Sequence, residues 1–284
     1  QAGSFENAEQ LSPEVMSQTH ERTRASCAAC TIGCEHIFHS TDASGSDASD
    51  GVRMEYENLF ALGPLCGVSD SNVVLEASRL CDELGLDTIS AGGSIAFAME
   101  CVEHGLLDEP DLTFGSGDAL LATLQKIGAR GGVGDLLAEG TRIASQRIGQ
   151  DAESFAAHVK GLELPGYEPR ALQTMALGFA VGSRGADHNR SGAYQVDFSD
   201  QVDRLNIDEA AVPLAIETED EAALMDSLIL CKFLRGVFED RFAAMAEMLR
   251  LVTGVEHSID DLREVAGRIV TAKKLFNIRQ GWSP

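Results

Sequence analysis

Apolar residues recur every three or four positions along most of this chain, which is the spacing of a helix that buries one face. The clearest example covers residues 73–84. Asp70 can cap the start of this helix with a side-chain oxygen, and Gly85 can end it because glycine readily adopts a left-handed backbone. Asp87 can then cap a second helix that ends near residue 104. We therefore expect two long helices joined by a short turn.

The same spacing predicts further helices in the rest of the chain. They are expected at about 117–128, 132–148, 171–182, 219–236, 239–252 and 259–276. The alternation that is typical of strands is nearly absent, and only residues 157–160 show it weakly. The expected fold class is therefore all-α.

Glycine and proline interrupt the helical pattern at residues 161–169, so we expect a domain boundary just before this stretch. The two helical domains would cover residues 1–156 and 157–284. Residues 40–51 consist almost entirely of Ser, Asp, Gly, Ala and Thr, and they are expected to form a mobile surface insertion.

The chain carries 45 acidic and 22 basic residues, which gives a net charge of −23. Binding to nucleic acid needs a basic face, so this charge argues against that class and indicates a solvated acidic surface. No stretch is long and apolar enough for a membrane span, and no signal peptide is visible. The seven cysteines are an odd number and do not resemble a disulfide scaffold. We therefore expect a reducing compartment, the cytoplasm.

Cys27, Cys30 and Cys34 form a C-x2-C-x3-C array, and thiols this close together are typical of a metal or cluster site. The backbone must curl if the thiols are to share one centre, and a glycine within the array allows such a curl. A centre that prefers four sulfurs needs one more ligand from elsewhere. A cubane cluster is the first interpretation, and a Cys3His zinc site is the alternative. The histidines that could complete the zinc site are His36 and His39.

The other four cysteines need separate interpretations. Cys81 and Cys101 fall within predicted helices beside apolar residues, so we expect both to be buried. Cys66 lies in a turn, and its role stays open. Cys231 ends the segment 226–231, and only the outline of that segment indicates a role for this cysteine.

Two short segments share one outline. Residues 82–87 begin and end with aspartate and join two predicted helices, which a simple interhelix turn explains. Their carboxylates and the following helix N-terminus could also bind a heterocycle and its anionic arm. Residues 226–231 again begin with aspartate but end in a thiol. This similarity indicates paired use on one ligand.

Two polar positions could take part in catalysis. Glu57 lies in the run Glu55-Tyr56-Glu57, and burial would raise the pKa of such a carboxyl toward the range of a general acid or base. His188 lies between Arg184 and Arg190 in a glycine-containing run, which suits an anionic or carbonyl-bearing site. From the residues alone, Glu57 could equally be an exposed glutamate, and His188 could lie at a solvated helix end.

These segments occur together and in this order in one known family. Over nearly its whole length the chain resembles the second and third domains of the tungsten-dependent aldehyde ferredoxin oxidoreductases. The segments that carry the resemblance are 27–34, 55–57, 62–67, 80–90, 95–100, 160–165, 183–188 and 275–279.

The resemblance implies a tungsten or molybdenum cofactor with two pterins beside a four-iron four-sulfur (4Fe-4S) cluster. The fourth cluster ligand would be Cys231, which closes the motif that corresponds to Asp-x-x-Gly-Leu-Cys. The residues that match the two pterin-binding motifs are Asp82, Gly85, Leu86, Asp87, Thr88, Asp226 and Leu230. The second motif departs from the pattern at Ile229, where glycine is usual, and a β-branched residue disfavours a left-handed backbone.

Catalytic roles are also implied by the resemblance. Glu57 matches a glutamate that acts as acid or base near the metal, and His188 matches a histidine that hydrogen-bonds the substrate carbonyl. The implied reaction oxidises an aldehyde to a carboxylic acid with oxygen from water. The cofactor supplies the redox chemistry, and ferredoxin accepts the electrons one at a time.

Two departures from the family shape the expectation. The N-terminal pterin-binding domain has no counterpart in this sequence, so we expect a piece of a larger protein that does not hold the tungsten cofactor firmly by itself. A homo-oligomer is compatible with the family. A metal bridge through Glu-x-x-His is not expected, because Arg79 stands three residues after Glu76.

Two alternatives stay open. One is a subunit of the same family that reduces aromatic acyl-CoA thioesters. The other is a non-catalytic helical scaffold stabilised by zinc or by a cluster.

Overall fold

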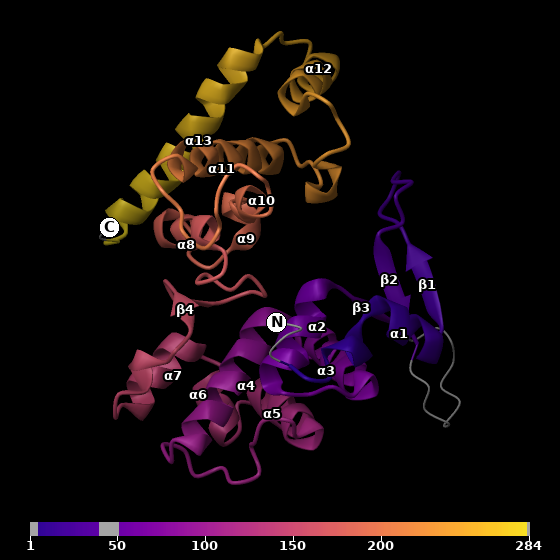
Figure 1. Ribbon diagram of the computed structural model, residues 1–284, viewed down its shortest axis with the longest axis vertical. Coiled ribbons are helices and arrows are strands. Elements are labelled where there is room, and N and C mark those ends of the chain that lie inside the picture. The colour runs from indigo at the N-terminus through magenta and orange to yellow at the C-terminus, as the bar shows by residue number, and fades with distance from the viewer. Residues whose placement is uncertain (1–4, 40–50, 283–284) are drawn as a thin grey trace. The chain divides into compact units, whose positions relative to one another are not determined.

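The computed structural model describes residues 5–39 and 51–282, and helices dominate it (Figure 1). Its contacts divide the chain into two compact units, Gln1–Gly166 and Tyr167–Pro284, which we call the N-terminal and C-terminal units. The low-complexity segment 40–51 lies outside the described residues except for Gly51. Each unit has a core of its own, so each is described separately.

The N-terminal unit contains the helices α1 to α7 and three short 3-10 turns. Their bounds are α1 Pro13–Thr19, α2 Tyr56–Leu62, α3 Ser71–Leu84, α4 Thr88–Glu103, α5 Gly117–Ala129, α6 Val133–Leu137 and α7 Thr141–Ile148, with 3-10 turns η1 Ala8–Leu11, η2 Pro64–Cys66 and η3 Ala152–Ser154. The helix α4 packs against α2, α3, α5, α6 and α7. Its fully buried residues include Ile95 and Met99, so α4 lies at the centre of this core.

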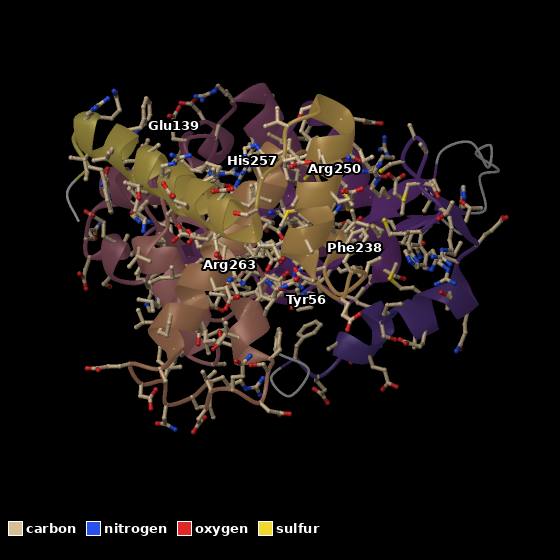
Figure 2. All side chains as sticks on the ribbon, turned by 90° about the horizontal axis from the view of Figure 1, so that it is seen from above. Tyr56, Glu139, Phe238, Arg250, His257 and Arg263 are labelled. Carbon is tan, nitrogen blue, oxygen red and sulfur yellow. The ribbon has the colours of Figure 1, made fainter. Side chains whose placement is uncertain are left out.

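The C-terminal unit is built only from helices and turns in the part that the structure describes. Their bounds are α8 Gln173–Val181, α9 His188–Ser191, α10 Tyr194–Asp197, α11 Ala211–Ser227, η4 Lys232–Leu234, α12 Arg241–Thr253 and α13 Ile259–Arg279. The long helix α13 runs beside α11 (Figure 1). The guanidinium of Arg263, labelled in Figure 2, lies 5.2 Å from the centre of the Phe242 ring and joins α13 to α12. The expectation of a helical fold is confirmed.

The turn between α3 and α4 forms as the capping residues predict. The Asp70 carboxylate accepts a hydrogen bond from the Asn72 amide at 2.9 Å and caps α3. Gly85 follows α3 with a φ of 68°, the left-handed conformation that ends many helices. The Asp87 carboxylate accepts from the Ser90 amide at 2.8 Å and caps α4. Local sequence therefore sets both ends of this turn.

Two expected helices have different bounds. The one expected at 132–148 is divided into α6 and α7, because Gly140 takes a φ of 80° between them. The one expected at 219–236 begins earlier, at Ala211, and ends at Ser227. Pro213 lies in its first turn, where proline removes no helical hydrogen bond. The proline therefore does not interrupt α11.

A small antiparallel sheet was not predicted. It has the order β1-β2-β3, with bounds Arg22–Ala25, Glu35–Phe38 and Val52–Met54. In its register Arg24 pairs with His36, and His36 pairs with Met54. The strand β1 is largely exposed, so its residues show no alternation of polar and apolar side chains.

The weak strand expected at 157–160 forms β4, His158–Val159, which pairs with β5, Leu162–Glu163. The strand β5 packs on α4 and α7, and this hairpin belongs to the N-terminal unit. The boundary between the units therefore lies after Gly166, whereas the sequence places it after residue 156.

Each unit uses a buried carboxylate to cap a helix that has no side-chain cap of its own. Glu163, which is 3% exposed, accepts from the Thr141 amide at 2.7 Å at the start of α7. Asp197, also 3% exposed, accepts from the amides of Thr174 and Met175 at 3.0 and 2.8 Å at the start of α8. Both carboxylates satisfy amides that would otherwise be buried without acceptors.

No helix within the described residues has the length and apolar character needed to span a bilayer.

Candidate functional site

The three clustered cysteines lie on the loop that joins β1 to β2. This loop curls as expected, since Gly33 and Ala29 both have a φ of 60°. The Arg24 guanidinium holds the curl by donating to the Gly33 carbonyl at 2.7 Å and to the Ile32 carbonyl at 3.1 Å. The loop is therefore shaped by strand pairing, by left-handed residues and by one arginine.

The environment of Cys27 favours the protonated thiol. Its Sγ donates to Oε1 of Glu35 at 3.6 Å, and the hydrogen bond and charge of that carboxylate raise the pKa of the thiol. Smaller effects come from Cys34 and Cys30, which lie close enough to influence Cys27 electrostatically. Arg53 pairs with the same Glu35 oxygen at 2.8 Å. A metal centre that binds this loop must displace the thiol proton.

The donor chemistry of this loop fits a sulfur-bound centre, because three thiols share one exposed turn. Within residues 5–39 and 51–282, however, no three Cys, His, Asp or Glu side chains are arranged closely enough to hold a metal ion. Of the two histidines of the zinc alternative, His36 is part of β2 and His39 contacts Thr23 at 3.4 Å. For a metal centre to bind this loop, the three thiols would have to move closer together.

The first aspartate turn, residues 82–87, exposes its opening carboxylate. Asp82 is exposed and forms no side-chain hydrogen bond or ion pair within the described residues. The Leu86 amide donates to the Cys81 carbonyl at 2.8 Å and closes the turn. Thr88 begins α4, and its hydroxyl donates to Oδ1 of Asn58 at 3.4 Å. The turn therefore combines free carboxylate oxygens with a helix N-terminus.

The second aspartate turn, residues 226–231, follows the same backbone path. The Leu230 amide donates to the Met225 carbonyl at 2.8 Å, as the Leu86 amide does in the first turn. Ile229 adopts a φ of 59°, although it is β-branched, and its side chain is 93% exposed. The departure from glycine at this position therefore leaves the left-handed geometry in place.

The two ends of the second turn have distinct partners. Asp226 pairs with Nζ of Lys232 at 2.9 Å and with the guanidinium of Arg190. Burial raises the pKa of Asp226, but these two cations outweigh it and keep the pKa low. Cys231 is exposed, and its Sγ accepts a hydrogen bond from the Phe233 amide at 3.4 Å. Such an acceptor sulfur is chemically suited to be a thiolate ligand.

Glu57 lies in the first turn of α2 and is mostly buried. Burial raises its pKa, a hydrogen bond from the Gly166 amide at 2.8 Å lowers it, and the charge of Asp87 raises it; together these effects bring the pKa to about 7. The Tyr56 hydroxyl donates to the Gly166 carbonyl at 2.9 Å, and Tyr56 is labelled in Figure 2. Both backbone groups of Gly166 are thus held by adjacent residues of α2.

A side chain at position 166 would displace the Tyr56 ring. A Cβ atom there would lie 2.7 Å from Cε1 of Tyr56. This close approach joins the 55–57 segment to the end of the 160–165 segment, which the sequence could not show. Gly166 is a site residue that the sequence reading missed.

His188 begins α9, directly after the cap residue Asp187. Its imidazole stacks on the Tyr167 ring with centroids 4.7 Å apart, and burial lowers its pKa. The side-chain amide nitrogen of Asn189 lies 3.0 Å from Nε2. An amide nitrogen only donates, so the proton of the neutral ring lies on Nδ1. Tyr167 was missed from the sequence, where only its aromatic character could have signalled it.

The remaining sequence expectations concern cysteines and the subunit bridge. Cys81 and Cys101 are buried as predicted, and Cys66 is buried as well. Burial raises the pKa of Cys66 and Cys81 to about 12 and that of Cys101 to about 11, so these thiols stay protonated. Arg79, which stands where the family's Glu-x-x-His motif would have its histidine, pairs with Glu76.

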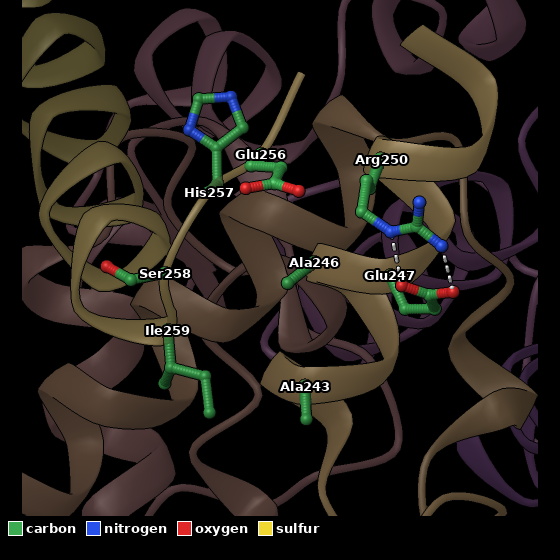
Figure 3. Close-up of a pocket in the computed structure, with 8 residues that line it drawn as sticks. All are labelled: Ala243, Ala246, Glu247, Arg250, Glu256, His257, Ser258 and Ile259. Carbon is green, nitrogen blue, oxygen red and sulfur yellow. Dashed lines mark hydrogen bonds and ion pairs between the residues drawn. The ribbon is translucent and has the colours of Figure 1, made fainter. Parts of the chain in front are cut away.

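An open depression of about 510 Å³ lies between α12 and the start of α13 (Figure 3). Its charged pair, Glu247 and Arg250, is satisfied internally, and Ser258 caps α13. None of the residues expected from the sequence to bind a cofactor or substrate lines this depression.

Comparison with known proteins identifies relatives along the whole chain. A tungsten-containing aldehyde ferredoxin oxidoreductase of Thermococcus kodakarensis is 33% identical over 294 aligned residues, which cover 100% of this chain and 47% of that protein. The WOR-like subunit of an aliphatic sulfonate oxidoreductase of Pyrococcus furiosus is 28% identical and covers 90% of this chain and 40% of that subunit. The chain thus spans about half the length of the curated relatives it matches.

The fold also has a solved counterpart. It is similar to a chain of the active-site complex BamBC of benzoyl coenzyme A reductase, with a TM-score of 0.69, 23% identity, and coverage of 95% of this chain and 46% of that one. A profile described as aldehyde ferredoxin oxidoreductase, domains 2 and 3, matches residues 1–284. Because that profile covers the entire sequence, the chain belongs to the aldehyde ferredoxin oxidoreductase family, of which it comprises domains 2 and 3.

Proposed function

We propose that this chain is part of a tungstopterin iron–sulfur oxidoreductase that oxidises aldehydes to carboxylic acids and passes electrons to ferredoxin. The observation that carries the proposal is the recurrence of one turn geometry at 82–87 and 226–231, with a carboxylate at its start and a thiol at the end of the second copy. The relatives named above support the tungsten chemistry.

The chain's own residues provide donors for both implied groups. Cys27, Cys30, Cys34 and Cys231 would bind the 4Fe-4S cluster. The two pterins would be held by the turns, through Asp82, Gly85, Leu86, Asp87, Thr88, Asp226 and Leu230. When bound, the tungsten or molybdenum centre supplies the two-electron redox chemistry, and the cluster relays single electrons. We expect the rest of a longer protein to be needed for firm retention of the metallopterin.

Glu57 is suited to move a proton at neutral pH. With a pKa of about 7, Glu57 is present in both protonation states under these conditions. Its Oε2 is held in place by the Gly166 amide, so a proton taken from an attacking water would reach a carboxylate of fixed orientation. The pKa of Glu57 is raised mainly by burial and not by a neighbouring base.

His188 is suited to bind a carbonyl oxygen. Burial keeps the imidazole neutral at pH 7, and the Asn189 contact places its proton on Nδ1. The stacked Tyr167 ring fixes the plane of the imidazole. A neutral N–H donor polarises a carbonyl without adding a charge to the site.

The setting we infer is a reducing one, since all seven cysteines are free thiols. This agrees with a cytoplasmic enzyme that uses ferredoxin. A second candidate is a subunit that reduces aromatic acyl-CoA thioesters, which the fold likeness to the benzoyl coenzyme A reductase complex favours. Assays of the full-length protein with aldehydes and with acyl-CoA thioesters separate the two.

Anaerobic reconstitution of this chain with iron and sulfide tests the cluster assignment. We expect an absorbance shoulder near about 400 nm that Cys231→Ala removes and Cys101→Ala, a buried cysteine, retains. A colourless protein that binds one zinc ion would instead support a structural scaffold. In the full-length protein, Glu57→Gln and His188→Ala should abolish turnover and leave the cluster spectrum unchanged. Near-normal turnover in either variant would refute the role of that residue.

A further inference from the structure

Five charged side chains of the C-terminal unit form a line of alternating ion pairs. Arg184 pairs with Asp187 at 2.8 Å, and Asp187 lies 3.8 Å from Nε of Arg190. Arg190 continues to Asp226, which also pairs with Lys232 at 2.9 Å. The line therefore runs from the cap of α9 to the second aspartate turn.

Arg190 is the member of this line that contacts both aspartates. Its backbone amide donates to Asp187 at 3.0 Å, so its position on α9 is fixed independently of its side chain. The side chain is 45% exposed, while that of Asp226 is 24% exposed. The guanidinium thus reaches the carboxylate from the solvent side and can leave without disturbing the core.

The first turn has no equivalent of Arg190. Asp82 is exposed and has no hydrogen bond or ion pair from its side chain within residues 5–39 and 51–282. The two turns share a backbone path, yet only the second has its opening carboxylate covered by a cation. Backbone geometry does not require this difference, so it reflects the placement of Arg190.

Guanidinium chemistry explains what Arg190 can replace. A guanidinium presents parallel N–H donors that match the two oxygens of a carboxylate. The 2-amino-4-oxopyrimidine edge of a pterin is a cyclic guanidine and presents the same pair of donors. We propose that Arg190 is an internal placeholder that occupies the Asp226 carboxylate until a pterin edge displaces it. This inference rests on the proposed function, which makes Asp226 a pterin-binding residue.

The remaining contacts make the exchange chemically consistent. Lys232 stays on Asp226 after Arg190 leaves, held also by the Ala222 carbonyl at 2.8 Å, so the carboxylate remains ionised. Asp187 receives the released guanidinium, because it already lies within ion-pair distance. No charge is left without a partner by the exchange.

Binding of 6-hydroxymethylpterin to this chain, followed by the fluorescence of the pterin, tests the inference. All variants carry Asp82→Asn, so that the first turn does not contribute to the signal. Removing the competitor with Arg190→Gln should tighten binding about two- to fivefold, the factor that corresponds to one exposed ion pair. Arg190→Lys keeps the charge but loses the guanidinium that donates to Oδ2 of Asp226, so its affinity should be intermediate.

Arg184→Gln is the matched control. It removes the same charge from the same line but does not touch Asp226, and its affinity should equal that of the parent. Asp226→Asn should abolish the remaining binding. If Asp226→Asn abolishes binding but Arg190→Gln does not tighten it beyond Arg184→Gln, the placeholder is wrong and the proposed function stands. If no variant binds the pterin through Asp226, both the placeholder and the proposed pterin site are wrong.

Discussion

The two aspartate turns share a hydrogen-bond pattern, an opening aspartate and two leucines, but they differ in the left-handed residue and in the residue that ends the turn. Gly85 takes the left-handed position in the first, and Ile229 takes it in the second. Asp87 ends the first turn by capping the 16-residue helix α4, whereas Cys231 ends the second by capping the three-residue η4. The first turn thus leads into the long, largely buried helix α4, and the second ends in an exposed sulfur.

The charges of the two turns also act differently. Asp87 is near enough to Glu57 to raise the pKa of that carboxyl. Asp226 instead forms ion pairs with two cations, Arg190 and Lys232, and these pairs lower its own pKa. One backbone motif can therefore serve two purposes, because its electrostatic surroundings come from other elements. The following predictions test this difference between the turns.

The largest expected effect concerns the pKa of Glu57, which the charge of Asp87 in the first turn helps to raise. Its folded-state pKa is raised from 4.5 to about 7, so the protonated carboxyl stabilises the fold below pH 4.5. This stability is lost as the pH rises through 7, and the free energy of unfolding should fall by up to about 3 kcal/mol. Urea unfolding at pH 5 and pH 8 measures the fall.

Glu57→Gln should remove this pH dependence, and Asp87→Asn should shift it to lower pH because the like charge is gone. An unchanged pH dependence in Glu57→Gln would show that another group causes it.

Exchanging the left-handed residues should change stability in opposite directions. Gly85→Ile should cost about 1–2 kcal/mol, because an L side chain is strained at this φ. The cost is purely conformational, since a Cβ at Gly85 has no neighbour within 4 Å. Ile229→Gly should gain about 0.5–1 kcal/mol, as the lost side chain is 93% exposed and packs on little.

Thermal unfolding of both variants gives the comparison. Equal destabilisation by the two changes would mean that Ile229 is not strained in this turn.

Removing the capping residue should destabilise the protein more at the first turn than at the second. Asp87→Ala should destabilise the N-terminal unit by about 1 kcal/mol, because the Ser90 amide at the start of α4 loses its acceptor. Cys231→Ala should change the free energy of unfolding by only a few tenths of a kcal/mol, since η4 is short and exposed. Urea titrations of the metal-free protein report both values, and a large loss in Cys231→Ala would contradict the view that this cysteine is not structural.

The smallest effect concerns the opening aspartates. Asp226→Asn should cost about 0.2–1 kcal/mol near pH 7, because exposed ion pairs contribute little. The pKa of Asp226 is lowered by Lys232 and Arg190, so this contribution is present above pH 3.8 and is lost as the pH falls through the lowered pKa. High salt should also reduce it. Asp82→Asn should have no effect, and a comparable loss there would mean that Asp82 has a partner in solution.

Much of the fold could be predicted because its signals are local. Asp70, Gly85 and Asp87 act on amides within a few residues of themselves, so their roles are readable from the chain. The break at Gly140 and the start of α11 were harder. Gly140 lies in a continuous apolar pattern, and Pro213 is a helix breaker except in a first turn.

Contacts between distant residues could not be predicted. Gly166 accepts a hydrogen bond from Tyr56 and donates one to Glu57, about 110 positions earlier in the chain, and nothing near Gly166 indicates this. Tyr167 stacks on His188, and Arg190 pairs with Asp226, through packing that no local pattern encodes. The small β1-β2-β3 sheet was missed because the exposed strand β1 shows no alternation and β3 is only three residues long.

By itself the sequence determined the helical periodicity, the capped turn at 82–87, the cysteine array and the family to which the chain belongs. These properties depend on residues a few positions apart, or on motifs whose order is visible in the chain. Only the tertiary structure decided that Glu57 is partly buried with a pKa of about 7, that Ile229 keeps a left-handed backbone, and that Arg190 covers Asp226. Burial and ion pairing depend on which distant side chains come into contact, and these contacts form only when the chain folds.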